Sequence, residues 1–236
     1  MSTEPPVVLV TGATGPAGRA VASRLMRDGA RLALMGRDAG RLEALGTELG
    51  LEPRSWLPIA GQLLEPEGAR AAAAAVEARF GRIDALVHLV GGWVGGTAVV
   101  DLDHDEVGSM LSQHLWTTLN ITQAVVPGMI ARGFGRVLAV SSPFAANPGP
   151  KGASYAIGKA AEEVIIRSLA QETAGSGVTA NLVVVRTIDK AHERLTAPTP
   201  KNASWTTPEE LAEVLAFLAS PAAAAVTGAR LSLGGR

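Results

Sequence analysis

Three residues could together carry acid–base chemistry. Tyr155 and Lys159 stand four residues apart, and Ser142 lies thirteen residues before the tyrosine. A phenol is a poor acid near neutrality, because its reference pKa is about 10. Positions i and i+4 lie on one face of a helix, so the Lys159 ammonium could stabilise the Tyr155 phenolate. Ser142 follows an apolar run that indicates a strand, and its hydroxyl could polarise a carbonyl there while Tyr155 moves a proton. Alone, the Tyr–Lys spacing is also typical of a solvated helix face.

A glycine-rich loop follows the first apolar run of the chain, Val7–Val10. Glycines permit a tight turn and let the backbone approach a pyrophosphate, and the N-terminus of the helix that follows offers N–H donors. A plain turn is the alternative, but a loop placed between the first strand and the first helix favours a dinucleotide site. The candidate cofactor-binding residues of this loop are Gly12, Thr14, Gly15, Pro16, Ala17 and Gly18.

The end of the second predicted strand bears on the choice of cofactor. An acidic residue there would bind the ribose hydroxyls of NAD. This chain has Gly36 and Arg37 instead, and an arginine can hold a 2′-phosphate. We therefore expect NADP(H) to be favoured over NAD(H). The alternative is that Arg37 only caps the turn on its solvent side.

Short apolar runs alternate with longer helical patterns, which predicts an α/β fold: a doubly wound, seven-stranded parallel sheet with helices on both faces. We expect one Rossmann domain over residues 1–236, with its ligand crevice beyond the carboxyl ends of the strands. The irregular stretch Asp189–Thr207 is either a substrate lid or a surface loop. The predicted strands are 7–10, 31–35, 55–59, 85–90, 136–140, 178–185 and 230–233, and the predicted helices are 17–28, 38–49, 66–80, 104–131, 152–174 and 208–219.

Composition excludes several classes of protein. A net charge of −1 gives no basic footprint for nucleic acid, and no apolar run is long enough to span a membrane. The absence of cysteine removes disulfides and thiolate sites. The first residues, Met1–Pro6, do not form a charged-then-apolar leader. The four histidines lack metal-ligand spacing, so we expect no metal and a cytoplasmic protein.

Together, the glycine-rich loop, Ser142, Tyr155 and Lys159 resemble the short-chain dehydrogenase/reductase family along essentially the whole chain. The resemblance implies a seven-stranded Rossmann fold that transfers hydride between a nicotinamide and a carbonyl/alcohol pair. It implies that Tyr155 is the general acid, that Ser142 binds the carbonyl oxygen, and that Lys159 holds the nicotinamide ribose. Further cofactor contacts implied by the resemblance are Gln62 near the adenine, Leu63, Val90, Gly91, Gly92 and Ile188.

The chain departs from the family pattern around the nicotinamide. His114 stands where the family has a proton-relay asparagine, so it is a candidate catalytic residue or, equally, a hydrogen-bonded structural histidine. His88-Leu89-Val90-Gly91 replaces Asn-Asn-Ala-Gly, and the better interpretation of His88 is structural. Lys190 replaces a threonine that touches the carboxamide. The stretch 91–96 is similar to the matching part of dihydropteridine reductases.

These observations predict an NADP(H)-dependent oxidoreductase acting on a small-molecule carbonyl or alcohol. The alternatives are a dihydropteridine or quinonoid reductase, and a catalytically silent dinucleotide-binding redox sensor. By resemblance we expect a homodimer or homotetramer packed through helices near 109–129 and 154–173. Trp93, Trp116 and Trp205 could line an apolar pocket or serve in packing.

Overall fold

The computed structural model describes residues 4–234. The predicted domain over 1–236 and the N-terminal stretch Met1–Pro6 therefore lie partly outside the described residues. Seven parallel strands form one sheet in the order β3-β2-β1-β4-β5-β6-β7. Nearly every residue of the central strands is buried, which explains why these runs are apolar throughout. The expectation of a seven-stranded Rossmann sheet is confirmed. The strands are β1 (Val7–Thr11), β2 (Arg31–Gly36), β3 (Trp56–Ala60), β4 (Ala85–His88), β5 (Gly135–Ser141), β6 (Val178–Val185) and β7 (Arg230–Leu233).

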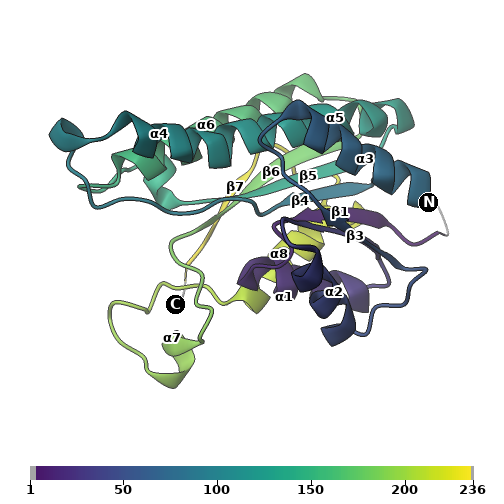
Figure 1. Cartoon of the computed structure of the whole chain (residues 1–236), viewed down its shortest axis with the longest axis horizontal. Coiled ribbons are helices and arrows are strands. Elements are labelled where there is room, and N and C mark those ends of the chain that lie inside the picture. Colours follow the sequence, from purple (N-terminus) through teal and green to yellow (C-terminus); the bar gives the residue numbers. More distant parts are fainter. Residues whose placement is uncertain (1–3, 235–236) are drawn as a thin grey trace.

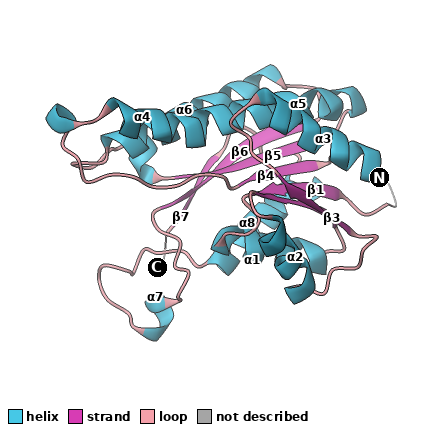
Figure 2. Cartoon of the chain, viewed as in Figure 1, coloured by secondary structure: helices cyan, strands magenta, loops and turns pink. Residues whose placement is uncertain are grey.

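Helices cover both faces of the sheet (Figures 1 and 2). One face carries α3 (Pro66–Phe80), α4 (His104–Leu111), α5 (Thr117–Arg132) and α6 (Ala153–Glu172), and the other carries α1 (Pro16–Arg27), α2 (Ala39–Glu48) and α8 (Pro208–Ala219). Pro208 fills the first position of α8, and Thr207 and Glu210 form a reciprocal capping box around it. Among the described residues, no helix combines the length and the apolar character needed to cross a bilayer.

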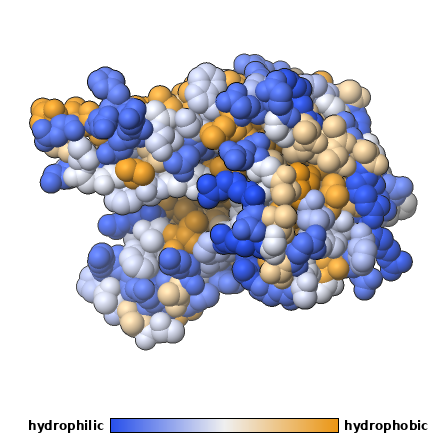
Figure 3. Space-filling view, viewed as in Figure 1, coloured by the Kyte–Doolittle hydropathy of each residue, from blue (hydrophilic) through white to orange (hydrophobic). Residues whose placement is uncertain are grey.

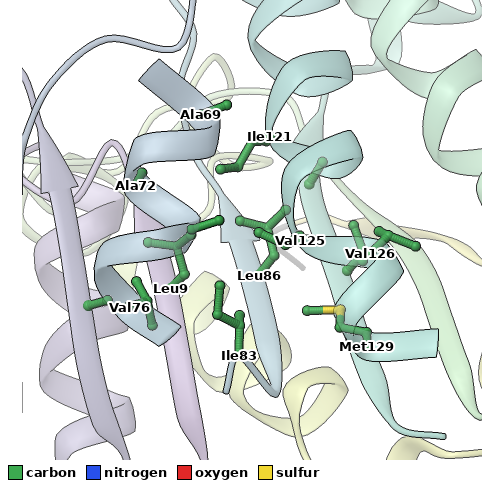
Figure 4. Close-up of a cluster of buried hydrophobic side chains, with 14 of the residues drawn as sticks. Leu9, Ala69, Ala72, Val76, Ile83, Leu86, Ile121, Val125, Val126 and Met129 are labelled. Carbon is green, nitrogen blue, oxygen red and sulfur yellow. The ribbon is translucent and has the colours of Figure 1, made fainter. Parts of the chain in front are cut away.

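Alternate residues of each strand supply two separate cores. Leu9 and Leu86 lie in the layer under α3 and α5, whereas Val8 and Val10 lie in the layer under α1 and α8. Figure 4 shows the first of these layers, where small α3 side chains such as Ala69 meet larger α5 side chains such as Ile121. The sheet is thereby fixed from both sides, which holds the carboxyl ends of its strands in place.

The helical stretch predicted near 104–131 is confirmed, but it is not one regular α-helix. The chain instead forms α4, a widened π-helical turn η2 (Ser112–Trp116) and then α5. All three segments keep helical dihedral angles, so the apolar spacing continues across the turn and conceals it. Such turns occur frequently at functional sites, and His114 lies in this one.

The stretch 189–207 is an ordered excursion from the body of the molecule (Figure 1). The buried Asp189 carboxylate accepts hydrogen bonds from the backbone N–H groups of Glu193 and Arg194, both at 2.8 Å, and these start the short helix α7 (Glu193–Thr196). A bridge between Ile188 and Thr206 closes the base of the excursion.

Candidate functional site

Ser142, Tyr155 and Lys159 converge on one cavity. Ser142 directly follows β5, and the other two residues lie one turn apart near the start of α6. All three line a cavity of about 490 Å³, together with His114. The structure therefore brings together the four residues predicted to be catalytic, although they come from three separate segments of the chain.

The Tyr155 ring is held edge-on between two other rings. Its centroid lies 5.6 Å from that of His114 and 6.2 Å from that of Phe144, with interplanar angles of 78° and 64°. Edge-to-face geometry is the favoured arrangement for aromatic rings at such distances. The phenol is thus positioned by packing and remains half-buried, at the surface of the cavity.

Lys159 is buried, and its ammonium has two strong partners. Nζ donates to the Val140 carbonyl at 2.7 Å and to Glu162 Oε2 at 2.6 Å. The spacing predicted an ammonium beside the Tyr155 oxygen, but within residues 4–234 no hydrogen bond joins Lys159 to Tyr155. An ammonium has three N–H donors, so one remains for a further partner in the cavity. Glu162 was missed by the sequence reasoning, although it lies three residues after Lys159 on the same face of the helix.

Among the described residues, no acceptor takes the hydroxyl proton of Ser142. Its Oγ accepts a hydrogen bond from the Phe144 backbone N–H at 3.3 Å, so the O–H can donate into the cavity. Its backbone carbonyl accepts from the Arg230 guanidinium at 3.2 Å, and Arg230 is paired with Glu163 at 3.0 Å. Glu163 also accepts from the Ser141 hydroxyl at 2.6 Å. This network joins β5, α6 and β7, and it fixes the position of Ser142.

His114 occupies a slot that two glycines leave open. A Cβ at Gly91 would lie 2.4 Å from the imidazole Cε1, and one at Gly158 would lie 2.9 Å from Cδ2. His114 Nε2 lies 3.0 Å from the Gly92 carbonyl. Since a carbonyl only accepts, Nε2 must carry the hydrogen. Burial, reinforced by the nearby Lys159 ammonium, lowers the pKa of His114 to about 3, so the ring is neutral at physiological pH.

His88 has the structural position that was expected of it. Its Nδ1 lies 2.8 Å from the Thr11 hydroxyl, and its Nε2 lies 3.3 Å from the Thr117 hydroxyl. Because Thr117 already donates its proton to the Gln113 carbonyl, it accepts from Nε2–H of His88. Thr11 then donates to Nδ1. Burial first, and then the charge of the Lys159 ammonium, lower the pKa of His88 to about 3.

The glycine-rich loop borders a second cavity of about 650 Å³, which shares Leu89, Val90 and Gly91 with the first. Gly12 adopts a left-handed φ of +72°, and a Cβ there would lie 2.7 Å from the Leu89 carbonyl oxygen. Only glycine allows β1 and β4 to approach so closely at this point. The two cavities thus form one cleft along the carboxyl ends of the strands.

The start of α1 faces this cleft with unused donors. Gly15 is the N-cap, no side chain caps the helix, and Pro16 fills its first position. Thr14 and Gly15 line the second cavity, and Ala17 lines the first. Pro16 and Gly18 line neither one. Gly18 packs beneath the loop, where a Cβ would lie 2.5 Å from the Gly12 carbonyl.

The far end of the cleft carries two guanidinium groups. The predicted Arg37 lines the second cavity, and so does Arg41, which the sequence reasoning missed. Arg41 lies one turn further along, at the start of α2, and donates to the Thr14 carbonyl at 3.2 Å. Gln62 and Leu63, the cofactor contacts that the resemblance implies, line the same cavity.

The other end of the cleft is largely apolar. Gly92, Trp93 and Ile188 line the first cavity, and Trp93 is 65% exposed. Figure 3 shows the surface hollowed between the α4 side of the molecule and the α7 excursion, with apolar atoms on the floor of the hollow. Trp116 and Trp205 do not line this cavity. Lys190 borders a separate surface hollow beside α1.

Within the described part of the chain, no group of three or more histidine or acidic side chains could hold a metal ion.

The family model described as short chain dehydrogenase matches residues 6–198. Over 234 residues the chain is 34% identical to the (2S)-[(R)-hydroxy(phenyl)methyl]succinyl-CoA dehydrogenase subunit BbsC of Thauera aromatica, with 95% of this chain and 91% of that protein covered. Its fold matches the 3-ketoacyl-(acyl-carrier-protein) reductase from Brucella melitensis complexed with NADH (TM-score 0.88, 25% identity, 99% and 98% of the two chains covered).

A further match is the NADPH-bound short chain oxidoreductase from Pseudomonas aeruginosa PAO1, which contains an atypical catalytic center (TM-score 0.86, 24% identity, 97% and 95% covered). The family model extends over most of the chain, and the relatives are dehydrogenases and reductases acting on CH–OH or C=O groups. The chain is an oxidoreductase and belongs to the short-chain dehydrogenase family.

Proposed function

We propose that this protein interconverts a carbonyl and an alcohol with NADP(H), and that Tyr155 is the general acid and base. The observation that carries the proposal is the convergence of Ser142, Tyr155 and Lys159 on one cavity that opens into the glycine-lined cleft. The substrate would lie against Ser142 and Tyr155 in the apolar end of the cleft.

The residues of the cleft fit a dinucleotide. The close approach at Gly12 leaves the loop backbone open to the second cavity, and the uncapped start of α1 offers N–H donors to a pyrophosphate. The free third donor of Lys159 suits a ribose hydroxyl. When bound, the nicotinamide would supply the hydride for reduction or accept it for oxidation.

The side chains divide the remaining work of reduction. The Ser142 hydroxyl donates a hydrogen bond to the carbonyl oxygen, which gains negative charge in the transition state. Tyr155 donates its proton to that oxygen, and the Lys159 ammonium stabilises the phenolate that is left. In the oxidation direction the same groups act in reverse, and the phenolate takes the proton of the alcohol.

The preference for NADP(H) rests on Arg37 and Arg41. Two guanidinium groups border the cavity next to the end of β2, and guanidinium pairs well with phosphate oxygens. The solved relatives do not decide between the cofactors, since one binds NADH and another NADPH.

The direct test is the oxidation of NADPH and of NADH against a panel of carbonyl compounds. The panel should include apolar ketones and aldehydes, because Trp93, Phe144 and Ile188 line the substrate end, and a quinonoid dihydropterin. Turnover with at least one carbonyl, faster with NADPH, is the expected result. Tight NADPH binding without turnover on any compound would favour the redox-sensor alternative.

A further inference from the structure

The mechanism proposed above leaves one buried acid beside the site without a role. The Glu162 side chain is 0% exposed, and its Oε2 accepts from Lys159 Nζ at 2.6 Å. Tyr155, Lys159 and Glu162 lie at i, i+4 and i+7 of α6, on one face of the helix. Within residues 4–234, Glu162 Oε1 has no hydrogen-bond partner. A carboxylate buried with an oxygen unsatisfied is costly, so this residue calls for an explanation.

His114 presents the complementary unsatisfied atom. Its Nε2 carries the hydrogen that is donated to Gly92, so Nδ1 is an acceptor. In the described structure, this buried Nδ1 lacks a partner and lies 4.0 Å from Glu162 Oε2. Nδ1 and Oε2 are thus two acceptors with no proton between them, although Oε2 already accepts from Lys159. A proton on Oε2, with a small shift of the side chain, would give the buried Nδ1 a hydrogen-bond donor.

The charges around Glu162 allow either protonation state. Burial raises the pKa of the Glu162 carboxyl, and the Lys159 ammonium opposes that shift. Glu163, the other acid nearby on α6, is paired with Arg230. His114 from η2 and His88 from β4 are both neutral, since the pKa of each is lowered to about 3. From α5, the Thr118 hydroxyl is uncharged but also opposes the rise in the pKa of Glu162. Lys159 is therefore the cation that Glu162 balances.

We propose that Glu162 is a protonation-dependent positioning residue, which alternates between a carboxylate paired with Lys159 and a neutral acid hydrogen-bonded to His114. As a carboxylate it cancels much of the Lys159 charge. As a neutral acid it leaves that charge free to stabilise the Tyr155 phenolate. Glu162 thus sets the pH at which Tyr155 changes its protonation state. The proton comes from solvent and returns to it, so no other reactant is needed. The inference rests on the proposed function for its catalytic consequence, but it can be tested without turnover.

The chain contains a single tyrosine, which makes the test direct. The ultraviolet absorbance of tyrosinate during an alkaline titration reports Tyr155 alone, and Tyr155→Phe supplies the blank. Glu162→Gln keeps the size of the side chain and removes its charge. We expect the tyrosinate midpoint of Glu162→Gln to lie lower than wild type by on the order of one pH unit. The pH profile of kcat for alcohol oxidation should move in the same direction, with KM little changed.

Glu163→Gln is the matched control. It removes a carboxylate from the same helix, but one that is paired with Arg230 and not with Lys159. Its tyrosinate midpoint should move much less. Equal midpoints for wild type and Glu162→Gln, or equal shifts for the two variants, would overturn the proposal. Circular dichroism across the titration confirms that the fold persists, and Glu162→Met provides the same measurement if the glutamine variant does not fold. A shifted midpoint in a protein that turns over no carbonyl would support the coupling and reject the proposed function instead.

Discussion

Replacing His88 with glutamine should make the stability of this protein less sensitive to acid. His88 is 1% exposed and is hydrogen-bonded through both ring nitrogens, between β1, β4 and α5. Its pKa falls from the ordinary 6.5 to about 3, chiefly because burial penalises the charged ring. The unfolded chain therefore binds a proton at a higher pH than the folded protein does. The contribution of neutral His88 to the stability of the protein is complete above about pH 6.5. It is lost progressively as the pH falls towards 3.

The size of the effect follows from this difference of pKa. Each pH unit below 6.5 costs about 1.4 kcal/mol of unfolding free energy through this one histidine. At pH 5 the loss is about 2 kcal/mol, and it levels off at about 5 kcal/mol below pH 3. Glutamine retains a donor and an acceptor but does not titrate. His114 and Glu162 titrate in both proteins, so their contributions largely cancel in the comparison.

Urea unfolding followed by circular dichroism, at pH 7 and pH 5, measures the effect. At pH 7, His88→Gln should be less stable than wild type by about 1 kcal/mol, because its hydrogen bonds are imperfect. At pH 5 the difference in unfolding free energy should shift by about 2 kcal/mol in favour of His88→Gln, because only the wild type loses stability through this residue. His104→Gln, which changes an exposed histidine, is the control. Its unfolding free energy should match that of the wild type at both pH values. Parallel losses of stability in wild type and His88→Gln would show that His88 is not held neutral, and would refute the reasoning.

Three other predictions concern the cofactor, the chemistry and the assembly. Arg37→Ala should weaken NADPH binding by roughly 10-fold to 150-fold, the loss of one charge-assisted contact of about 1.5–3 kcal/mol, while NADH binding changes little; equal weakening of both in titration calorimetry would reject the NADP(H) assignment. Ser142→Ala should lower kcat by roughly a hundredfold to a thousandfold with little change in KM, and a change confined to KM in steady-state kinetics would contradict its role. Ile157 and Val164 lie two turns apart on the outer side of α6 and are 43% and 61% exposed, so we expect self-association through this helix. Light scattering of the wild type should give a dimer or tetramer, and Val164→Glu should dissociate it. A monomeric wild type at micromolar concentration would count against this expectation.

The sheet could be predicted from sequence because both of its faces are covered. Burial on two sides demands uninterrupted apolar runs, and all seven lie within a few residues of the strands observed. The glycine loop was recognisable for a similar reason, since only glycine fits the left-handed position 12 beside Leu89. Ser142, Tyr155 and Lys159 converge because strand ends and the following helix starts gather at one edge of such a sheet.

Other features depend on geometry that spacing does not contain. Helical periodicity continues through η2, so the widened turn around His114 could not be seen. Lys159 has possible partners at both i−4 and i+3. The sequence alone does not show that its ammonium donates to Glu162 and Val140. Nor does it show that, in the described part of the chain, Lys159 and Tyr155 form no hydrogen bond. Arg41 was recognisable only once the start of α2 was known to border the cleft. Residues such as Pro16 and Gly18 belong to the loop motif, yet they lie outside both cavities.

The most direct test of the account is Tyr155→Phe, assayed on a carbonyl substrate that the wild type reduces. The change keeps the ring that packs between His114 and Phe144, and it removes the hydroxyl group that carries the transferable proton. We predict that kcat falls by roughly a hundredfold to ten-thousandfold, while NADPH binds with an unchanged dissociation constant. Near wild-type turnover by Tyr155→Phe would contradict the account, because the proton would then come from another group.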